Sequence, residues 1–68
     1  PWQVRYRLAE EYYAAYGSVT AMASDYKPNG IWLKKWLSEQ KQIRMGKRKG
    51  KTLSEEQVNQ LNAIGMEW

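Results

Sequence analysis

Residues 31–45, which read IWLKKWLSEQKQIRM, decide the fold of this 68-residue chain because they have the periodicity of an amphipathic helix. At about 100° per residue, the apolar side chains and one amide fall on a single arc. This arc consists of Trp32, Leu33, Trp36, Leu37, Gln40 and Ile43. A buried amide needs hydrogen-bond partners, so we expect Gln40 to bond to the backbone of a loop, with base recognition as the alternative.

The preceding helix is predicted over residues 3–16 and ends at Gly17, where glycine adopts a left-handed conformation without strain. Spacings of three and four residues place apolar side chains on one stripe of this helix. The stripe consists of Trp2, Tyr6, Ala9, Tyr13 and Tyr16. Residues 18–30 form a connector, whose Ala-Met-Ala sequence is compatible with a helical turn over 21–26. From the connector we expect three side chains to point inward: Val19, Met22 and Tyr26.

The third predicted helix has the clearest start signal in the sequence. Ser54 is an N-cap residue, and Gln57 three positions later completes a capping box. Leu53 before the cap and Val58 in the helix form a hydrophobic staple. Three short amphipathic helices must bury their apolar stripes against one another. The sequence therefore predicts an all-α fold, a small three-helix bundle with a tryptophan- and tyrosine-rich core, as one domain over residues 1–68.

The core has to be built from aromatic side chains, because the chain has four Trp and five Tyr but no Cys and no His. Neither a disulfide nor a Cys/His zinc site can therefore stabilise this small domain. We expect Trp2, Trp36 and Trp68 to lie in the core. For Trp32, at the edge of its arc, and for Tyr26, base stacking stays an alternative to core packing.

No catalytic site, cofactor or metal site is predicted. The absence of His and Cys removes the common general bases and the thiol nucleophile. Adjacent glutamates, as in Glu10-Glu11 and Glu55-Glu56, point to different sides of their helices. Residues 46–52, GKRKGKT, resemble a phosphate-binding loop, but one residue is missing between the glycines and no strand precedes them. We interpret this segment as a basic turn.

Positive charge is concentrated in one segment, although the net charge of the chain is only +4. Residues 34–51 carry eight of the 11 basic side chains and a single acid, Glu39. The basic residues are Lys34, Lys35, Lys41, Arg44, Lys47, Arg48, Lys49 and Lys51. Such a field favours phosphate contacts, which are independent of base sequence and sensitive to salt. An acidic protein surface and a merely solvated face are the alternatives. If nucleic acid binds, we expect the main contribution from Lys41, Arg44, Lys47, Arg48 and Lys49.

The succession of these features resembles the helicase-associated domain, a module appended, often in tandem copies, to bacterial superfamily-2-type helicases. The resemblance covers the whole chain. It rests on Trp2, Gly17, Leu33, Trp36, Gln40-Lys41, Leu53-Ser54, Leu61 and the closing Gly65-Met66-Glu67-Trp68. Two positions depart from the family pattern: Tyr16 replaces a frequent His, and Lys34 replaces a frequent Gly.

This resemblance implies an accessory domain that binds DNA or RNA within a bacterial chain whose motor is an ATP-dependent helicase. Its further partners would be that motor and tandem copies in the same chain. We expect the domain, cut from this longer cytoplasmic protein, to be monomeric by itself and not to contact a membrane. The alternative is a docking module that packs against the motor or a neighbouring copy. An exposed apolar patch including Trp32 and Tyr26 would favour docking.

Overall fold

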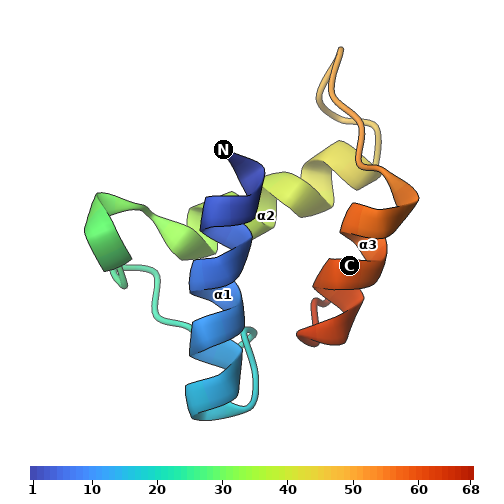
Figure 1. The fold of residues 1–68 in the computed structure, drawn as a ribbon. Helices are drawn as coiled ribbons and strands as arrows, with labels where there is room; N and C mark the ends of the chain where they lie inside the picture. Colours follow the sequence, from blue (N-terminus) through green and yellow to red (C-terminus); the bar gives the residue numbers. More distant parts are fainter.

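The computed structural model describes residues 1–68 and contains three α-helices and no strand (Figure 1). Helix α1 spans Trp2–Tyr16, α2 spans Leu33–Arg44 and α3 spans Glu55–Ala63, and a short 3-10 turn, η1, spans Pro28–Gly30. Helix α1 crosses α2, and α3 lies beyond the end of α2 after a loop that projects from the body (Figure 1). The predicted all-α three-helix bundle is confirmed.

The connector between α1 and α2 differs from the prediction. The helical turn considered over residues 21–26 is absent, and the regular element η1 forms at the Pro-Asn-Gly sequence instead. Isolated turn bonds from Met22 N to Val19 O and from Tyr26 N to Ala23 O replace consecutive helical bonds. Gly17 ends α1 as predicted, with a φ of 78° in the left-handed conformation that glycine adopts without strain.

The capping box of α3 is confirmed in both directions. The hydroxyl of Ser54 accepts a hydrogen bond from Gln57 N at 3.1 Å, and Ser54 N donates to Gln57 Oε1 at 2.9 Å. Such a cap contributes about 1 kcal/mol, which matters for a helix of nine residues. Leu53, before the cap, is half-buried and packs against the core.

Nine buried side chains form the core. They are Tyr6, Ala9, Val19, Met22, Leu33, Trp36, Leu37, Leu61 and Ile64. The inward orientation predicted for Val19 and Met22 is confirmed, but Tyr26 is 36% exposed, so that prediction is wrong. Tyr26 instead packs its ring 5.1 Å from the half-buried Tyr12, beside the core.

The tryptophans occupy three different environments. Trp36 is buried, whereas Trp2 and Trp68 are half-buried and pack against the core from its rim. Trp2 stacks on Tyr6 at 5.4 Å and meets Trp36 edge-on at 5.5 Å. Trp32 is 48% exposed, so the core alternative for it is wrong. The reason is local: α2 begins at Leu33, two residues later than predicted, and the backbone of Trp32 (φ −72°, ψ 85°) leaves the helical path that would carry its ring inward.

Gln40 is 2% exposed and is the only buried polar residue. Its Nε2 donates to Trp36 O at 3.2 Å, and its Oε1 accepts from Trp2 Nε1 at 2.8 Å. The prediction that Gln40 bonds to the backbone of a loop is therefore wrong. The amide bonds instead to its own helix and to the indole of α1, because α1 crosses α2 at this point. Because the side chain is buried and both ends of its amide are bonded within the fold, Gln40 is not presented to a base.

Tyr6 connects α1 to α3. Its hydroxyl donates to Gln60 O at 2.9 Å. Burial raises the pKa of Tyr6 above its ordinary value of 10.0, and the nearby carboxylate of Glu10 raises the pKa further. The neutral phenol is thus the form that the fold stabilises.

Candidate nucleic-acid interface

The structure divides the basic residues of α2 between two flanks. Lys34 and Lys41 are seven residues apart and lie on one flank, where both line a hollow with Met66 and Glu67. Lys35 is rotated from Lys34 by about 100° and lines a different hollow. The eight basic residues that cluster in the sequence therefore do not form one patch.

The flank of Lys35 meets α1 and the α2–α3 loop. Two open hollows lie side by side here, of 510 and 320 Å³, and share Arg5, Trp36 and Glu39 in their walls. Lys51 lines the first hollow, and Lys35 lines the second. We call this surface the basic edge; it consists of Arg5, Trp32, Lys35, Arg48 and Lys51.

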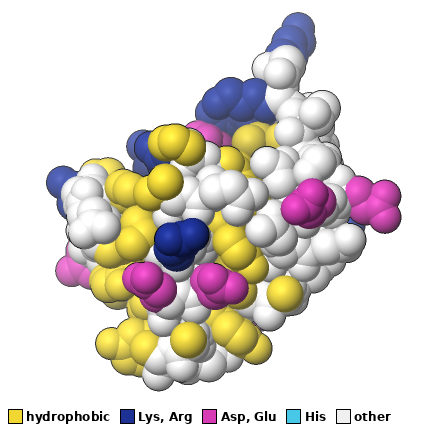
Figure 2. Space-filling model, viewed as in Figure 1, with side chains coloured by type: hydrophobic (Ala, Val, Ile, Leu, Met, Phe, Trp, Pro, Cys, Tyr) yellow, Lys and Arg dark blue, Asp and Glu magenta, His cyan; other side chains and the backbone are white.

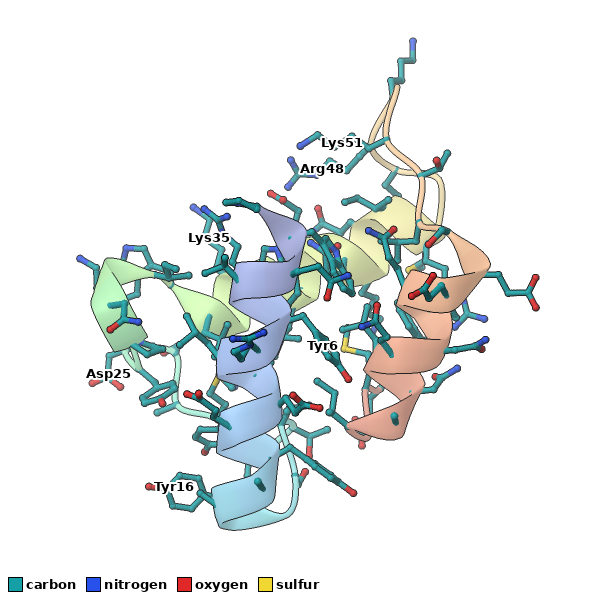
Figure 3. All side chains as sticks on the ribbon, viewed as in Figure 1. Tyr6, Tyr16, Asp25, Lys35, Arg48 and Lys51 are labelled. Carbon is teal, nitrogen blue, oxygen red and sulfur yellow. The ribbon has the colours of Figure 1, made fainter.

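The labelled members of the basic edge follow one another along one side of the molecule. Lys35, Arg48 and Lys51 run from α2 to the loop in Figure 3. Lys and Arg side chains gather in the same region of the surface, and another caps the tip of the projecting loop (Figure 2). Charge from α2 and from the α2–α3 loop is thereby presented on one face.

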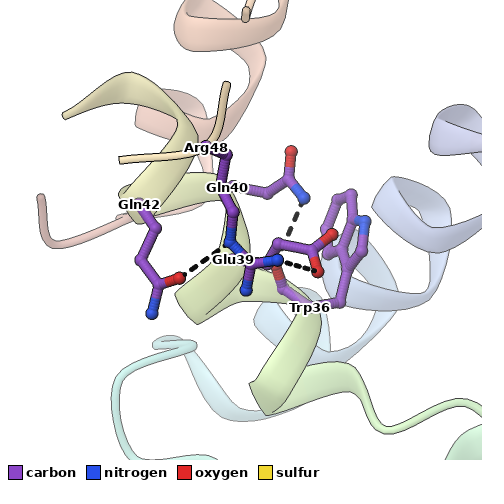
Figure 4. Close-up of polar contacts among 5 residues, drawn as sticks. All are labelled: Trp36, Glu39, Gln40, Gln42 and Arg48. Atoms are coloured by element: carbon purple, nitrogen blue, oxygen red, sulfur yellow. Dashed lines mark hydrogen bonds and ion pairs between the residues drawn. The ribbon is translucent and has the colours of Figure 1, made fainter. Parts of the chain in front are cut away.

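Arg48 attaches the loop to α2 (Figure 4). Its Nε donates to Gln42 Oε1 at 3.0 Å, and its Nη1 lies 3.7 Å from Glu39 Oε2. An exposed ion pair of this kind contributes only about 0–1 kcal/mol. The ion pair nevertheless neutralises Glu39, the carboxylate that lines both hollows, so the net charge of the edge stays positive.

Arg5 is the member that sequence reasoning missed, because it lies outside the basic segment. It is half-buried in α1 and lines both hollows of the basic edge. Its position carries a signal that could have revealed it: it follows Trp2 by three residues and precedes Ala9 by four. Residues at that spacing share one side of a helix, so Arg5 flanks the stripe that packs on α2.

The other predicted site residues lie away from the basic edge or on the loop. The guanidinium of Arg44 lies 4.4 Å from the ring centre of Trp68, in a cation–π contact. Lys34 and Lys41 face the tail, as described above. Lys47 and Lys49 are exposed on the α2–α3 loop.

Exposed aromatic side chains lie on the connector side of the molecule. Lys27 Nζ lies over the exposed ring of Trp32, 4.7 Å from the ring centre. Tyr16 is 71% exposed at the end of α1, and Tyr12 contacts both Tyr16 and Tyr26 at centroid distances of 4.6 and 5.1 Å. We call Tyr12, Tyr16 and Tyr26 the tyrosine cluster. Exposed apolar surface including Trp32 and Tyr26 is thus present.

No group of three or more His, Cys, Asp or Glu side chains is placed to hold a metal ion, and no helix is long and apolar enough to cross a bilayer. The fold defines a small all-helical domain with an aromatic core and a basic edge. The sequence model of the helicase-associated domain matches residues 1–68, the whole chain, and the chain belongs to that family. The resemblance drawn from the sequence is thus confirmed. No curated protein and no solved structure matches the chain.

Proposed function

We propose that this domain is an accessory module of a bacterial helicase-like protein and binds the phosphate backbone of nucleic acid along its basic edge. One observation carries the proposal: Arg5 of α1, Lys35 of α2 and Lys51 of the loop surround two adjoining hollows. Lys and Arg side chains are the usual donors to phosphate oxygens, and contacts of this kind are independent of base sequence.

The charge balance of the edge supports this use. Its one carboxylate, Glu39, is paired with Arg48, which leaves Arg5, Lys35 and Lys51 without an acidic partner. If these three residues each neutralise one phosphate of duplex DNA, the logarithm of the binding constant should fall with the logarithm of salt concentration with a slope of about −2.7. The exposed Lys47 and Lys49 would extend the charged surface along the loop.

The proposal extends to the parent protein. Membership of the helicase-associated domain family supports a parent chain with an ATP-dependent helicase motor in the bacterial cytoplasm. Binding by a single module of this size would be weak. Motor and tandem modules in one chain would raise the effective concentration of each contact, and so would raise the overall affinity.

The test is an NMR titration of the domain with short single-stranded DNA, single-stranded RNA and duplex DNA at two salt concentrations. We expect salt-sensitive shifts at Arg5, Lys35 and Lys51, and none at Lys34 and Lys41 on the opposite flank. Absence of shifts with every nucleic acid at low salt would contradict the proposal. Shifts centred on Lys34 and Lys41 would move the interface to the other flank.

Protein docking is the second candidate, favoured by the tyrosine cluster. Tyr16 and Tyr26 expose aromatic surface next to each other around Tyr12, with a geometry that could receive the motor or a second module. Sedimentation of the domain over a range of concentrations tests the second-module version. Self-association that is lost in Tyr16→Ser would support docking through this cluster.

A further inference from the structure

Trp32 is the one tryptophan whose ring the fold leaves largely uncovered. It stands at the N-terminal end of α2, outside the helical path, and is 48% exposed. Tryptophan and tyrosine rings that are free to stack hold bases in proteins that bind single strands.

The surroundings combine an aromatic face with phosphate donors. Trp32 lines the 320 Å³ hollow together with Arg5, Lys35 and the backbone of Gly30. Gly30 lines the hollow without a side chain, and apart from its chain neighbours no heavy atom lies within 4 Å of the place a Cβ would occupy. An aromatic ring that shares a hollow with two cations offers a surface for a base and donors for its flanking phosphates.

Lys27 fits the same arrangement from outside the hollow. Its ammonium lies 4.7 Å from the ring centre, but Lys27 is not among the residues that line the hollow. The ammonium lies over one face of the ring, so a base has to stack on the other face, and Lys27 does not fill the hollow. The three cations around the ring also disfavour an apolar protein partner, because burial would remove them from water without a counter-charge.

We propose that Trp32 and the hollow beside it form a stacking site for one unpaired base, with Arg5 and Lys35 binding the adjacent phosphates. The inference rests on the nucleic-acid-binding function proposed above and names its substrate class: single-stranded nucleic acid. In a duplex, both faces of each base are covered by its neighbours in the stack, so the Trp32 ring has no face to pair with. Single-strand affinity then includes a contribution that duplex affinity lacks.

The experiment separates bases from backbone by comparing oligo(dT) with an abasic oligonucleotide of the same length and charge. Trp32→Leu removes the ring and keeps an apolar side chain at an exposed position. We expect this variant to bind oligo(dT) about 5- to 150-fold more weakly, the equivalent of ~1–3 kcal/mol for one stacked base. Its affinity for the abasic strand should equal that of the wild-type domain.

Two matched variants accompany this one. Trp32→Tyr keeps an aromatic ring and should retain most of the affinity for oligo(dT). Tyr16→Leu removes a ring that is more exposed but lies outside the hollow, and should bind both strands as the wild type does. The wild-type comparison of the two strands needs no variant, so it holds even if Trp32→Leu folds poorly.

Each outcome either supports or overturns the stacking site at Trp32. Equal binding of oligo(dT) and the abasic strand by the wild type, or an equal loss for both strands in Trp32→Leu, would overturn the stacking site while leaving backbone binding intact. Failure of the wild type to bind either strand at low salt would instead overturn the proposed function itself. A loss in Tyr16→Leu confined to oligo(dT), with Trp32→Leu unaffected, would move stacking to the tyrosine cluster and overturn the assignment to Trp32.

Discussion

One flank of α2 places Lys35 beside Arg5 and the exposed ring of Trp32, whereas the other places Lys34 and Lys41 beside Met66 and Glu67 of the tail. The lysines are of one kind and are close in the sequence. Their surroundings differ because α1 crosses one flank and the tail returns to the other. Met66 N donates to Leu61 O at 3.1 Å after Gly65, and this bond turns the tail back. A cluster of charges in a sequence thus becomes a site only on the flank where other segments complete it.

The largest effect expected concerns Trp36, which lies beneath both hollows of the basic edge. Trp36→Ala should reduce the free energy of unfolding by ~3–5 kcal/mol, because it removes a buried ring and leaves a cavity. Thermal unfolding followed by circular dichroism measures this loss. Trp68→Ala should have a smaller effect, since Trp68 is half-buried. Equal losses in the two variants would show that the rim of the core matters as much as its centre.

The second effect tests the two flanks directly. The double variant Lys35→Gln/Lys51→Gln removes two phosphate contacts and should reduce the magnitude of the salt slope by about 1.8 on duplex DNA, or about 1.4 on a single strand. Lys34→Gln/Lys41→Gln makes the same change in net charge on the opposite flank and should leave the slope unchanged. Fluorescence anisotropy at several salt concentrations provides the slopes. Equal reductions would mean that only the overall charge matters.

A smaller effect is expected from Glu39→Gln, which keeps the shape of the side chain and removes its charge. The substitution releases Arg48 from its ion pair and removes the repulsion of phosphate, so affinity for nucleic acid should rise about 1.5- to 5-fold. Glu67→Gln is the matched control, because Glu67 lies in the hollow of Lys34 and Lys41. A larger rise in the control would place the interface on the tail flank.

The smallest effect appears only at alkaline pH and concerns Tyr6, which holds α1 against α3. Because the pKa of Tyr6 is higher in the folded than in the unfolded chain, its contribution to stability is complete below pH 10.0 and is lost as the pH rises through the folded pKa. The difference in unfolding free energy between the wild type and Tyr6→Phe should therefore shrink above pH 10.0. Urea unfolding at a series of pH values measures it. A difference that grows with pH would contradict the raised pKa.

Features encoded by neighbouring residues could be predicted from the sequence. The capping box of Ser54 and Gln57, and the end of α1 at Gly17, depend on contacts within a few positions. The arc of α2 was equally predictable, apart from Trp32 at its edge. That ring is exposed because the helix starts at Leu33, two residues later than predicted, and periodicity does not fix a helix boundary.

The candidate site was less predictable, because it depends on how the helices cross. The charge of residues 34–51 pointed to eight basic residues without separating them, and of the five expected to contribute most only Arg48 lies on the basic edge. Nothing in that segment shows which flank meets α1. Arg5 belongs to the site because of that crossing. The partner of Gln40 was missed for the same reason, since Trp2 reaches it from another helix, 38 residues away.

The α2–α3 loop is held at both ends, by Arg48 on α2 and by the capping box at Ser54. The part of the basic segment outside these anchors is therefore only the short stretch between them, and Lys51 N donates to Arg48 O at 3.3 Å within it. Each residue that a ligand must immobilise on binding opposes the interaction by about 1–2 kcal/mol of backbone entropy. A loop anchored at both ends is partly ordered before a ligand binds. Binding through its basic side chains therefore loses less backbone entropy than binding through a disordered basic tail of the same composition.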